Sequence, residues 1–507
     1  MKLSKIERLK LQLRPQEYYK RIESLDPTKI TDADRFYLKN FGIYNTKLRP
    51  EEFMLRIRIP AGRIQKEQLR FIVALAKSHG ASILVTARAQ MELHRLKFSE
   101  AVAIHKKLLE HDIATFATLT DNIRNIVTDV ADGLEGMEVY HIIDEIDRFA
   151  TDCKLLGMIP RKFNTAIVGV TRSVESYFTN DAFFALARKD GVEGFNLYLG
   201  GKNSHFAQDA DIFVLPAQVP KMFEAIIKTY QKYGLRQNRT RSRLFHLLEE
   251  IGLEEFKNRL KEYYSDWESA GEYLLQKERP WSMKRYEKGV LHRYETRFGE
   301  IEVGELERLL DFEAEIRFGI DQNIYLLAQK ELGIGKKPRE ILVCAGEKYC
   351  IYSLFDTKQE AWRLPLQRIE KLGVRVGYSG CLKGCGRHIA ADIGLVGIRT
   401  NLFGEVERGV RFYLGGLYST GELPARLIFW AVPLRCLRKV IEIVLDEYER
   451  SEAEDFESFS KTLLALTPKQ LAYHILRRFV GEESELSSLP GEIEDVELKE
   501  LEQRAFS

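Results

Sequence analysis

Four of the six cysteines in this chain of 507 residues stand in two tight pairs. The first pair lies in CAGEKYC (344–350) and the second in CLKGC (381–385). Thiolates are soft ligands, and four of them can hold zinc or an iron–sulfur cluster. Neither pair has the two-residue spacing common in structural zinc sites, and glycines beside the second pair let the backbone pass close to a bulky group. The pattern favours an iron–sulfur cluster, whereas the isolated Cys153 and Cys436 are typical of buried, unliganded cysteines.

Basic side chains recur at places where a pocket could form. Arg56 and Arg58 alternate with apolar residues in FMLRIRIP (53–60), so a strand with one buried face would direct both guanidinium groups the same way. Further basic residues are Arg88, Arg124 in DNIRN, Arg161 and Lys162 in PRKFN, and Arg236, Arg239, Arg241 and Arg243 in LRQNRTRSR. Each alone is typical of a solvated surface charge. If several converge, this nearly neutral chain (77 Lys+Arg, 75 Asp+Glu) needs an acidic ligand for them, such as a polycarboxylate or polyphosphate.

The stretch PRKFN (160–164) suggests a small anion site. Proline favours entry into an extended segment, in which Lys162 and Asn164, two residues apart, point the same way. A cation beside a neutral amide can grip an oxyanion. An edge strand with a polar face explains the same stretch equally well.

The elements that must position these residues alternate along the chain. Period-two patterns predict strands at 53–60, 82–88, 165–170 and 194–201. Period-3.6 patterns predict helices at 64–81 and 98–112 and mostly helices over 216–275. The pattern indicates a mixed α+β protein.

Two short echoes indicate an internal duplication. GFNLYLGG (194–201) returns as GVRFYLGG (409–416), and AQMEL (89–93) and QNIYL (322–326) occupy comparable places. We therefore expect duplicated halves with pseudo-twofold symmetry around a cofactor cleft. The expected segments are a helical extension (1–48), a first ferredoxin-like half-repeat (49–115), a cofactor and substrate domain (116–284), a second half-repeat (285–335), a cluster domain (336–450) and a helical acidic tail (451–507).

Composition excludes several classes. The net charge of +2 gives no general argument for binding nucleic acid or membrane, and no apolar run is long enough to span a bilayer. The charged N-terminus lacks the apolar core of a secretion signal, so the cytoplasm is the expected compartment. GIGKKP (333–338) lacks the strand–glycine–helix context of a dinucleotide site, so the sequence gives no sign of a flavin or nicotinamide domain.

From about residue 35 to residue 450 the chain resembles the sirohaem and [4Fe–4S] nitrite and sulfite reductases, most of all the ferredoxin-type assimilatory nitrite reductases. The resemblance lies in motifs that follow the family's order: FMLRIRIPAGRI, VTARAQMELH, DNIRNI, PRKFN, GFNLYLGG, CAGEKYC with YSGCLKGCGRHIAADIGLVG, and RFYLGG. The spacing of the two cysteine pairs, with glycine and arginine after the last cysteine, is the most specific of these.

The resemblance implies a role for each candidate residue. Cys344, Cys350, Cys381 and Cys385 would bind a [4Fe–4S] cluster, with Cys385 also bridging to the iron of sirohaem. Arg56, Arg124, Lys162 and Asn164 would face the substrate. The eight carboxylates of sirohaem would explain the remaining candidates, which are Arg58, Arg88, His94, Asn125, Arg161, Arg236, Arg239, Arg241, Gln322 and Asn323.

The same resemblance implies the reaction, a six-electron reduction of nitrite to ammonia with electrons from ferredoxin or a similar small donor, by a chain acting as a monomer. Asn164 indicates nitrite, because sulfite reductases typically carry a second lysine there. Sulfite reduction on the same scaffold is the alternative, and a non-catalytic zinc protein is a third reading. Three departures from the family pattern bear on the site: Glu92 in place of glutamine, the acidic VTDVADG beginning near Thr128, and Leu382 with Lys383 between the last two cysteines.

Overall fold

The computed structural model describes residues 3–507, apart from the side chain of Cys153. The chain forms two compact units. The first comprises Met1–Lys202, Ala207–Glu278 and Ser282–Lys336, and the second comprises Asn203–Phe206, Arg279–Trp281 and Lys337–Ser507. Each unit is described by itself.

The N-terminal segment is mainly helical but ends in a strand. Helices α1 (Lys5–Gln12), α2 (Pro15–Tyr19) and α3 (Asp32–Leu38) precede β1 (Ile43–Thr46). Strand β1 pairs antiparallel with β2 (Arg49–Ile57), placing Ile43 opposite Leu55. The expected helical extension over 1–48 therefore does not hold for its last residues. Ile43 and Asn45 are buried, and this alternation suits the edge of a sheet.

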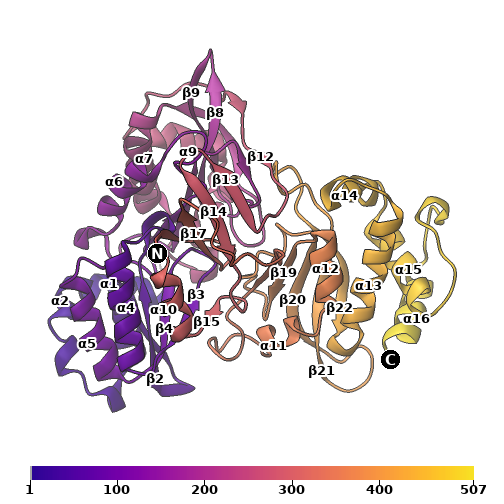
Figure 1. Cartoon of the computed structure of the whole chain (residues 1–507), viewed down its shortest axis with the longest axis horizontal. Coiled ribbons are helices and arrows are strands. Elements are labelled where there is room, and N and C mark those ends of the chain that lie inside the picture. Colours follow the sequence, from indigo (N-terminus) through magenta and orange to yellow (C-terminus); the bar gives the residue numbers. More distant parts are fainter. Residues whose placement is uncertain (1–2) are drawn as a thin grey trace. The chain divides into compact units, whose positions relative to one another are not determined.

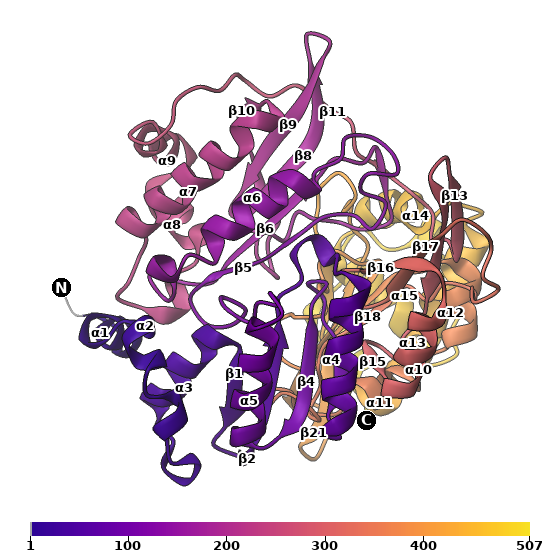
Figure 2. The same cartoon turned by 60° about the vertical axis from the view of Figure 1, so that its left-hand side comes forward.

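The first sheet has the strand order β1-β2-β4-β3-β15. Its remaining strands are β3 (Ser82–Val85), β4 (Met91–Leu96) and the short β15 (Glu300–Ile301). Helices α4 (Lys66–Ser78) and α5 (Phe98–Leu109) lie across one face of this sheet (Figure 2). They lie there because each carries an apolar stripe, for example Leu69, Ile72 and Ala76 of α4, all fully buried.

A second sheet repeats this plan with the order β13-β14-β17-β16. Its elements are β13 (Met283–Tyr286), β14 (Gly289–Tyr294), α10 (Val303–Asp311), β16 (Ala314–Phe318) and β17 (Ile324–Ala328). The loops TARAQ (86–90) and GIDQN (319–323) occupy the same place in the two copies. Each has a left-handed residue at its fourth position, Ala89 (φ 52°) and Gln322 (φ 70°). The echo between AQMEL and QNIYL thus marks equivalent hairpins.

A larger sheet is also duplicated. In the first unit, β5 (Ile123–Val127), β6 (Phe163–Val168), β8 (Ala182–Lys189), β9 (Val192–Leu199) and β10 (Gln208–Val214) pair in sequence as parallel, parallel, antiparallel and antiparallel neighbours. In the second unit, β18 (Ile341–Val343), β19 (Val376–Ser379), β20 (Ile393–Thr400), β21 (Glu407–Leu414) and β22 (Arg426–Pro433) pair in the same way. The two sheets share one topology.

Individual contacts repeat as well. Asp181 accepts a hydrogen bond from the backbone N of Asn164 (2.8 Å), and its backbone O accepts one from the N–H of Gly200 (2.8 Å). Asp392 does the same with the N–H groups of Arg375 (2.8 Å) and Gly415 (3.0 Å). The GFNLYLGG and GVRFYLGG segments are the fourth strands of their sheets. The mixed α+β class and the internal duplication are confirmed.

Helices cover the large sheet of the first unit. They are α6 (Tyr140–Ala150), α7 (Val219–Tyr233), α8 (Leu244–Ile251) and α9 (Leu253–Leu260). Their apolar faces share one core with the strands, in which Ile146, Phe163, Phe184, Phe223 and Tyr230 are almost completely buried. Three two-residue strands, β7 (Arg172–Ser173), β11 (Glu272–Tyr273) and β12 (Gln276–Lys277), complete the unit.

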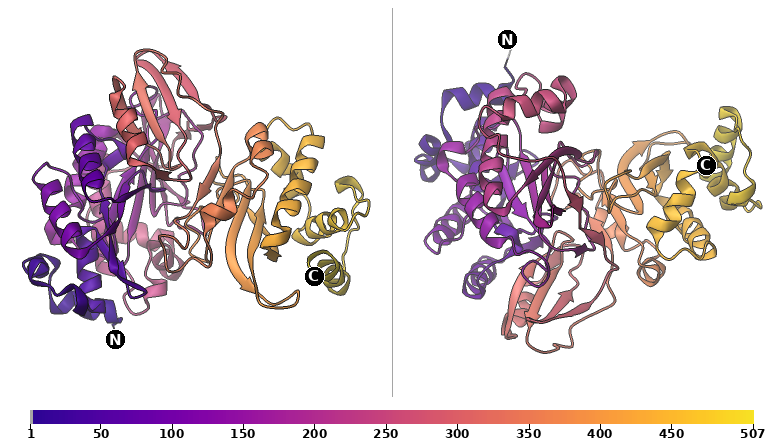
Figure 3. Two further views of the ribbon diagram at one scale, coloured as in Figure 1. Left: turned by 60° about the horizontal axis from the view of Figure 1, so that its bottom comes forward. Right: turned by 90° about the horizontal axis from the view of Figure 1, so that it is seen from above.

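In the second unit, helices gather on one face of the sheet (Figure 3). They are α11 (Thr357–Ala361), α12 (Leu366–Leu372), α13 (Leu434–Arg450), α14 (Phe456–Leu464), α15 (Pro468–Phe479) and α16 (Asp495–Phe506). Figure 1 shows α13, α15 and α16 stacked beyond β22. The C-terminal tail is packed, because Phe506 is fully buried against the rings of Phe403, Phe429 and Phe479. None of the helices described is both long and apolar enough to cross a membrane.

Candidate functional site

The predicted site residues divide between the two units. The cations predicted for substrate and macrocycle lie in the first unit, and Arg124 and Lys162 stand at the amino ends of β5 and β6. Arg124 is the second residue of β5, Lys162 directly precedes β6, and Asn164 is the second residue of β6. Because β5 and β6 are parallel neighbours, with Ile123 opposite Phe163, their amino ends meet at one edge of the sheet. The four paired cysteines lie in the second unit.

Cysteines follow the carboxyl ends of two neighbouring parallel strands. Cys344 comes directly after β18, and Cys381 comes two residues after β19. The backbone N–H of Gly380 donates to the sulfur of Cys344 (3.1 Å). Burial raises the pKa of the Cys350 thiol, and the neighbouring Cys344 and Cys381 raise it further. The fold thus brings Cys344, Cys350 and Cys381 within electrostatic range of one another, while Cys385 is exposed on the loop that follows.

The arrangement does not suit one small ion. Among residues 3–507, no three side chains of histidine, cysteine, aspartate or glutamate are grouped closely enough to hold a single metal ion. Four ligands of one zinc ion must converge on one point, whereas the thiolates of a [4Fe–4S] cluster each bind their own iron at a separate corner. Leu382 and Lys383, the predicted departures, lie on the exposed loop, with the ammonium of Lys383 over the ring of Tyr352 (2.8 Å to the centroid).

Arg124 is a cation without a carboxylate partner in the part of the chain that the structure describes. It donates to the backbone oxygens of Thr118 and of Thr120 (2.8 Å), and its Nε has no hydrogen-bond partner. Burial lowers the pKa of Arg124 well below its ordinary value, and the charges of Arg56, Arg161 and Arg88 lower it further against the opposing effect of Asp121. The structure therefore brings three of the predicted arginines, Arg56, Arg88 and Arg161, within electrostatic range of Arg124, which has no carboxylate partner in the described residues.

Arg56 differs from Arg124 because it has an acidic partner. Its Nε donates to Oε1 of Glu92 (2.7 Å), its Nη2 contacts the same oxygen, and its Nη1 donates to the backbone O of Thr118 (3.3 Å). The Nε2 of His94 lies 2.8 Å from Oε2 of Glu92. Burial alone would raise the pKa of Glu92, but Arg56 and His94 outweigh it and lower the pKa to about 2. The carboxylate of Glu92 thus contacts both Arg56 and His94.

The side-chain oxygen of Asn164 is buried. The residue is 6% exposed, its backbone N–H donates to Asp181, and its side-chain oxygen has no hydrogen-bond partner. Lys162, two residues earlier, is partly exposed at the start of the strand. A buried amide oxygen without a hydrogen-bond partner costs free energy. We therefore expect a water molecule, or a ligand that donates a hydrogen bond, to lie beside it.

Arg88 and Asn125 are linked next to this edge. Arg88 donates to the side-chain oxygen of Asn180 (2.9 Å) and to the backbone O of Thr165 (3.1 Å) and of Asn125. In return, Nδ2 of Asn125 donates to the backbone O of Arg88 (3.0 Å) and of Ile59 (2.7 Å). These bonds fix the backbone between TARAQ and β5.

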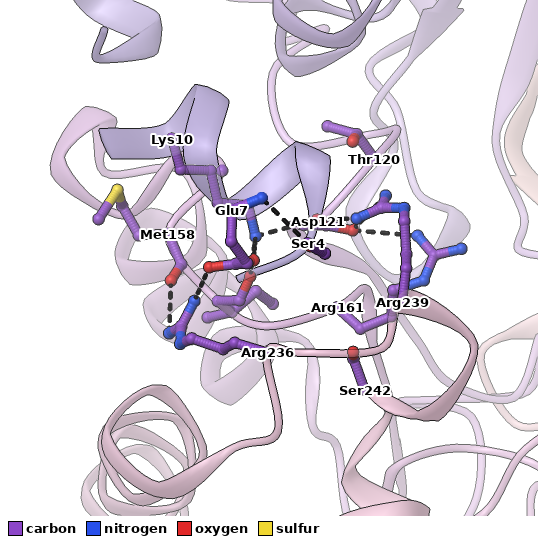
Figure 4. A network of polar contacts seen from close by, with 12 residues as sticks. Ser4, Glu7, Lys10, Thr120, Asp121, Met158, Arg161, Arg236, Arg239 and Ser242 are labelled. Carbon is purple, nitrogen blue, oxygen red and sulfur yellow. Dashed lines mark hydrogen bonds and ion pairs between the residues drawn. The ribbon is translucent and has the colours of Figure 1, made fainter. Parts of the chain in front are cut away.

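Sequence reasoning missed a buried acidic centre, Asp121, which Figure 4 shows among its partners. Asp121 is fully buried and pairs with Lys10 (3.0 Å), Arg161 (3.0 Å) and Arg239 (2.6 Å). Burial would raise its pKa, but these three cations hold the pKa well below the ordinary range. The side chains of Arg161 and Arg239 remain 29% and 31% exposed, so both can still reach a ligand. The signal was present, because Asp121 begins the DNIRN motif.

The same network anchors helix α1. Lys10 also donates to Glu7 (2.5 Å) and to the backbone O of Ile159 (2.8 Å). Arg236, predicted to bind the macrocycle, instead pairs with Glu7 (2.7 Å) and donates to the backbone O of Met158 (3.1 Å) and of Gln231 (2.8 Å). Arg236 therefore fastens the N-terminal helix to the unit.

Four more predicted cofactor residues have structural contacts of their own. The side chain of Arg58 is fully buried, pairs with Asp147 (2.6 Å) and donates to the backbone of β5, so we do not assign it to a ligand. Arg241 is mostly exposed and lies 3.5 Å from Glu249. Gln322 reaches the backbone O of Val85 (3.4 Å), and Asn323 bonds with Thr296 (3.0 Å) and Asp321 (2.8 Å). Gln322 and Asn323 therefore stabilise the hairpin at GIDQN.

The acidic stretch after β5 forms a buried cluster of its own. Asp129 is 7% exposed and accepts hydrogen bonds from Ser173 (2.5 Å), Tyr177 (3.1 Å) and the backbone N–H of Ala131 (2.8 Å). Burial raises its pKa to about 6, although these hydrogen bonds act in the opposite direction.

Asp129 is expected to make stability depend on pH. The native carboxyl binds its proton more tightly than an unfolded aspartate, so its contribution is most favourable below about pH 4 and is lost as the pH rises through about 6. A shift of this size is worth roughly 3 kcal/mol. Asp129→Asn, which keeps the shape, should therefore gain stability relative to the unchanged protein between pH 4 and 7, measured by chemical unfolding. The exposed Asp144→Asn is the control, and a constant difference across this range would contradict the assignment.

Two family models match the chain. The model described as "Nitrite/Sulfite reductase ferredoxin-like half domain" matches residues 47–111, and the model described as "Nitrite and sulphite reductase 4Fe-4S domain" matches residues 119–267. The first match covers the sheet of β2 to β4, and the second covers the first copy of the duplicated large sheet. Both matches precede the paired cysteines, which lie in the second copy.

Curated relatives and a solved structure extend the comparison over most of the chain. The chain is 29% identical over 467 residues to a ferredoxin–nitrite reductase of Synechococcus elongatus, covering 82% of this chain and 90% of the relative. It is 26% identical to the chloroplastic ferredoxin–nitrite reductase of Zea mays, covering 86% of each. The NirA protein of Mycobacterium tuberculosis has the same fold, with a TM-score of 0.82 at 20% identity over 93% of this chain and 98% of that one. The resemblance inferred from the motifs is confirmed: the chain is similar to nitrite and sulfite reductases over most of its length.

Proposed function

We propose that this protein is a nitrite reductase that converts nitrite to ammonia with electrons from a small external donor such as ferredoxin. The observation that carries the proposal is Arg124, a partly buried guanidinium without a carboxylate partner in residues 3–507, set among Arg56, Arg88 and Arg161. Such a cluster is stabilised by a bound anion. The named ferredoxin–nitrite reductases among the relatives support nitrite as that anion.

We assign the cofactors on the chemistry of the donors. Cys344, Cys350, Cys381 and Cys385 supply the four thiolates that a [4Fe–4S] cluster requires, and Cys385 would also meet the iron of sirohaem. Arg161 and Arg239 keep exposed guanidinium surface, so these residues suit the carboxylates of the macrocycle. When bound, the two groups supply the one-electron steps that no side chain can perform.

The side chains of the first unit supply binding and protons. The reaction takes nitrite, six electrons and eight protons to ammonium and two waters, so negative charge must be offset as oxygen leaves. Arg56 and Arg124 each direct N–H groups to the backbone O of Thr118, which fixes both guanidinium planes near one point. Together with Lys162 they attract the anion, stabilise its charge and assist proton delivery to the departing oxygen.

Sulfite reduction is the second candidate, and Asn164 separates the two. Replacing Asn164 by lysine adds a cation where the structure has a buried amide, and it should strengthen binding of doubly charged sulfite more than that of nitrite. We expect the ratio of kcat/KM for sulfite to that for nitrite to rise about tenfold or more. The measurement is turnover of both anions with one reductant. Asn258→Lys, at an exposed position of α9, is the control. An unchanged ratio in Asn164→Lys would contradict the role of Asn164.

The proposal as a whole is tested by its product. Purified, cofactor-loaded protein is given nitrite and a chemical reductant without oxygen, and ammonia is quantified. Ammonia equal to the nitrite consumed supports the proposal. If the protein efficiently reduces only sulfite, forming sulfide, then sulfite reduction is its function and the proposal of nitrite as substrate is wrong. We also propose that the protein acts as a monomer in the cytoplasm, which gel filtration and fractionation of cells can check.

A further inference from the structure

The ion pair between Arg56 and Glu92 joins β2 and β4, two neighbouring strands in the interior of the first sheet. Glu92 on β4 stands directly opposite Arg56 on β2, and opposite Leu84 on β3 at its other side. The side chain of Glu92 is 5% exposed, whereas that of Arg56 is 23% exposed. The pair is therefore anchored at its acidic end and open at its basic end.

Both oxygens of Glu92 are occupied. Oε1 accepts from Nε and Nη2 of Arg56, and Oε2 lies 2.8 Å from Nε2 of His94. With a pKa lowered to about 2 by Arg56 and His94 against the effect of burial, Glu92 carries a full negative charge at neutral pH. A buried carboxylate held in this way keeps its charge and its position together.

Glu92 acts on the anion site through Arg56. The backbone O of Thr118 accepts from Arg56 (3.3 Å) and also from Arg124, so the two guanidinium groups lie side by side. Arg124 has no acidic partner in the described residues, as shown above. Arg56, Arg124 and Glu92 thus contribute two positive charges and one negative charge, a net of one, beside the charges of Arg88 and Arg161.

We propose that Glu92 determines specificity by setting this net charge, so that a singly charged anion of the nitrite type is favoured over a doubly charged one of the sulfite type. The inference rests on the proposed function and deepens it. A doubly charged anion gains twice as much from each added positive charge as a singly charged one. A negative charge held beside Arg56 therefore costs the doubly charged anion more. Glu92 is a positioning residue here, because it acts through Arg56.

Replacing Glu92 by glutamine tests the proposal, because Glu92→Gln removes the charge and keeps an oxygen for Arg56. Two readouts are needed at mildly alkaline pH, where sulfite is mostly doubly charged: kcat/KM for both anions, and binding of both anions to the oxidised protein without reductant, by calorimetry. We expect the preference for sulfite over nitrite to rise about tenfold in both readouts, and to rise more at low salt. An unchanged ratio, including an equal loss for both anions, would overturn the proposal, because it would mean that Glu92 only holds Arg56 in place.

Two further variants sharpen the result. In the double variant Arg56→Met with Glu92→Gln the net charge returns to one, so the preference should return to that of the unchanged protein. A persisting shift would overturn the proposal. Asp132→Asn removes another buried carboxylate, the partner of Arg63 (3.0 Å), and should leave the ratio unchanged. If the unchanged protein reduces neither anion, the proposed function fails, while the calorimetric ratio still decides the role of Glu92.

Discussion

Replacing Cys385 by serine is expected to abolish nitrite reduction and to lower the iron and acid-labile sulfide content of the purified protein. Cys385 is the cysteine to which the proposal gives two tasks, the fourth cluster ligand and the link to the sirohaem iron. A serine oxygen is a poorer ligand for iron in a cluster than a thiolate, and loss of the link removes the path by which electrons reach nitrite. The expected loss of turnover is at least about a thousandfold, beyond what one misplaced binding group causes.

The control for this variant is Cys436→Ser. Cys436 is also a cysteine, 6% exposed on α13, but it belongs to no pair. It should keep the iron content, the colour and the turnover, at the cost of some stability. If Cys385→Ser instead keeps its iron, sulfide and turnover, Cys385 is not a ligand and the cluster assignment is wrong.

Replacing Arg124 by methionine is expected to cost about two to three orders of magnitude in kcat/KM for nitrite, the effect of removing one preorganised donor from a developing charge. Methionine keeps an unbranched apolar stem and removes the charge. Because Arg124 is a partly buried cation without a carboxylate partner in the described residues, its removal also relieves repulsion from Arg56, Arg88 and Arg161. The lost bonds to the backbone O of Thr118 and Thr120 act in the opposite direction.

Stability should therefore change little, by about 1 kcal/mol or less in the free energy of unfolding. A large loss of activity with little change in stability is the result expected for a cation that serves function rather than folding. Arg148→Met, an arginine on α6 with 75% of its side chain exposed, is the matched control and should change neither quantity. A parallel loss of activity and stability in Arg124→Met would show that Arg124 mainly holds the loop of Thr118 and Thr120 in place.

Local patterns predicted most of the fold. The alternation in FMLRIRIP gave β2, the stripe of Leu69, Ile72 and Ala76 gave α4, and the echo of GFNLYLGG located the fourth strand of each large sheet. The strand β1 was missed because only its pairing with β2 distinguishes Ile43–Thr46 from the end of the helical segment.

The partners of charged residues could not be predicted in the same way. Asp121 attracts Lys10, Arg161 and Arg239 from distant parts of the chain, and Arg58 meets Asp147 on α6. Nothing in the local sequence specifies such pairs, because they depend on the packing of separate elements. Glu92 was noted as a departure, but its effect depended on register. An irregularity between Phe53 and Leu55 in the pairing of β2 with β4 places Glu92 opposite Arg56.

The most direct test of the central claim is the absorption spectrum of the purified protein, taken together with its iron content. We predict a strongly coloured protein with the bands of sirohaem and five iron atoms per chain, four in the cluster and one in the macrocycle. A colourless protein with zinc and without iron, in well-loaded preparations, would contradict it.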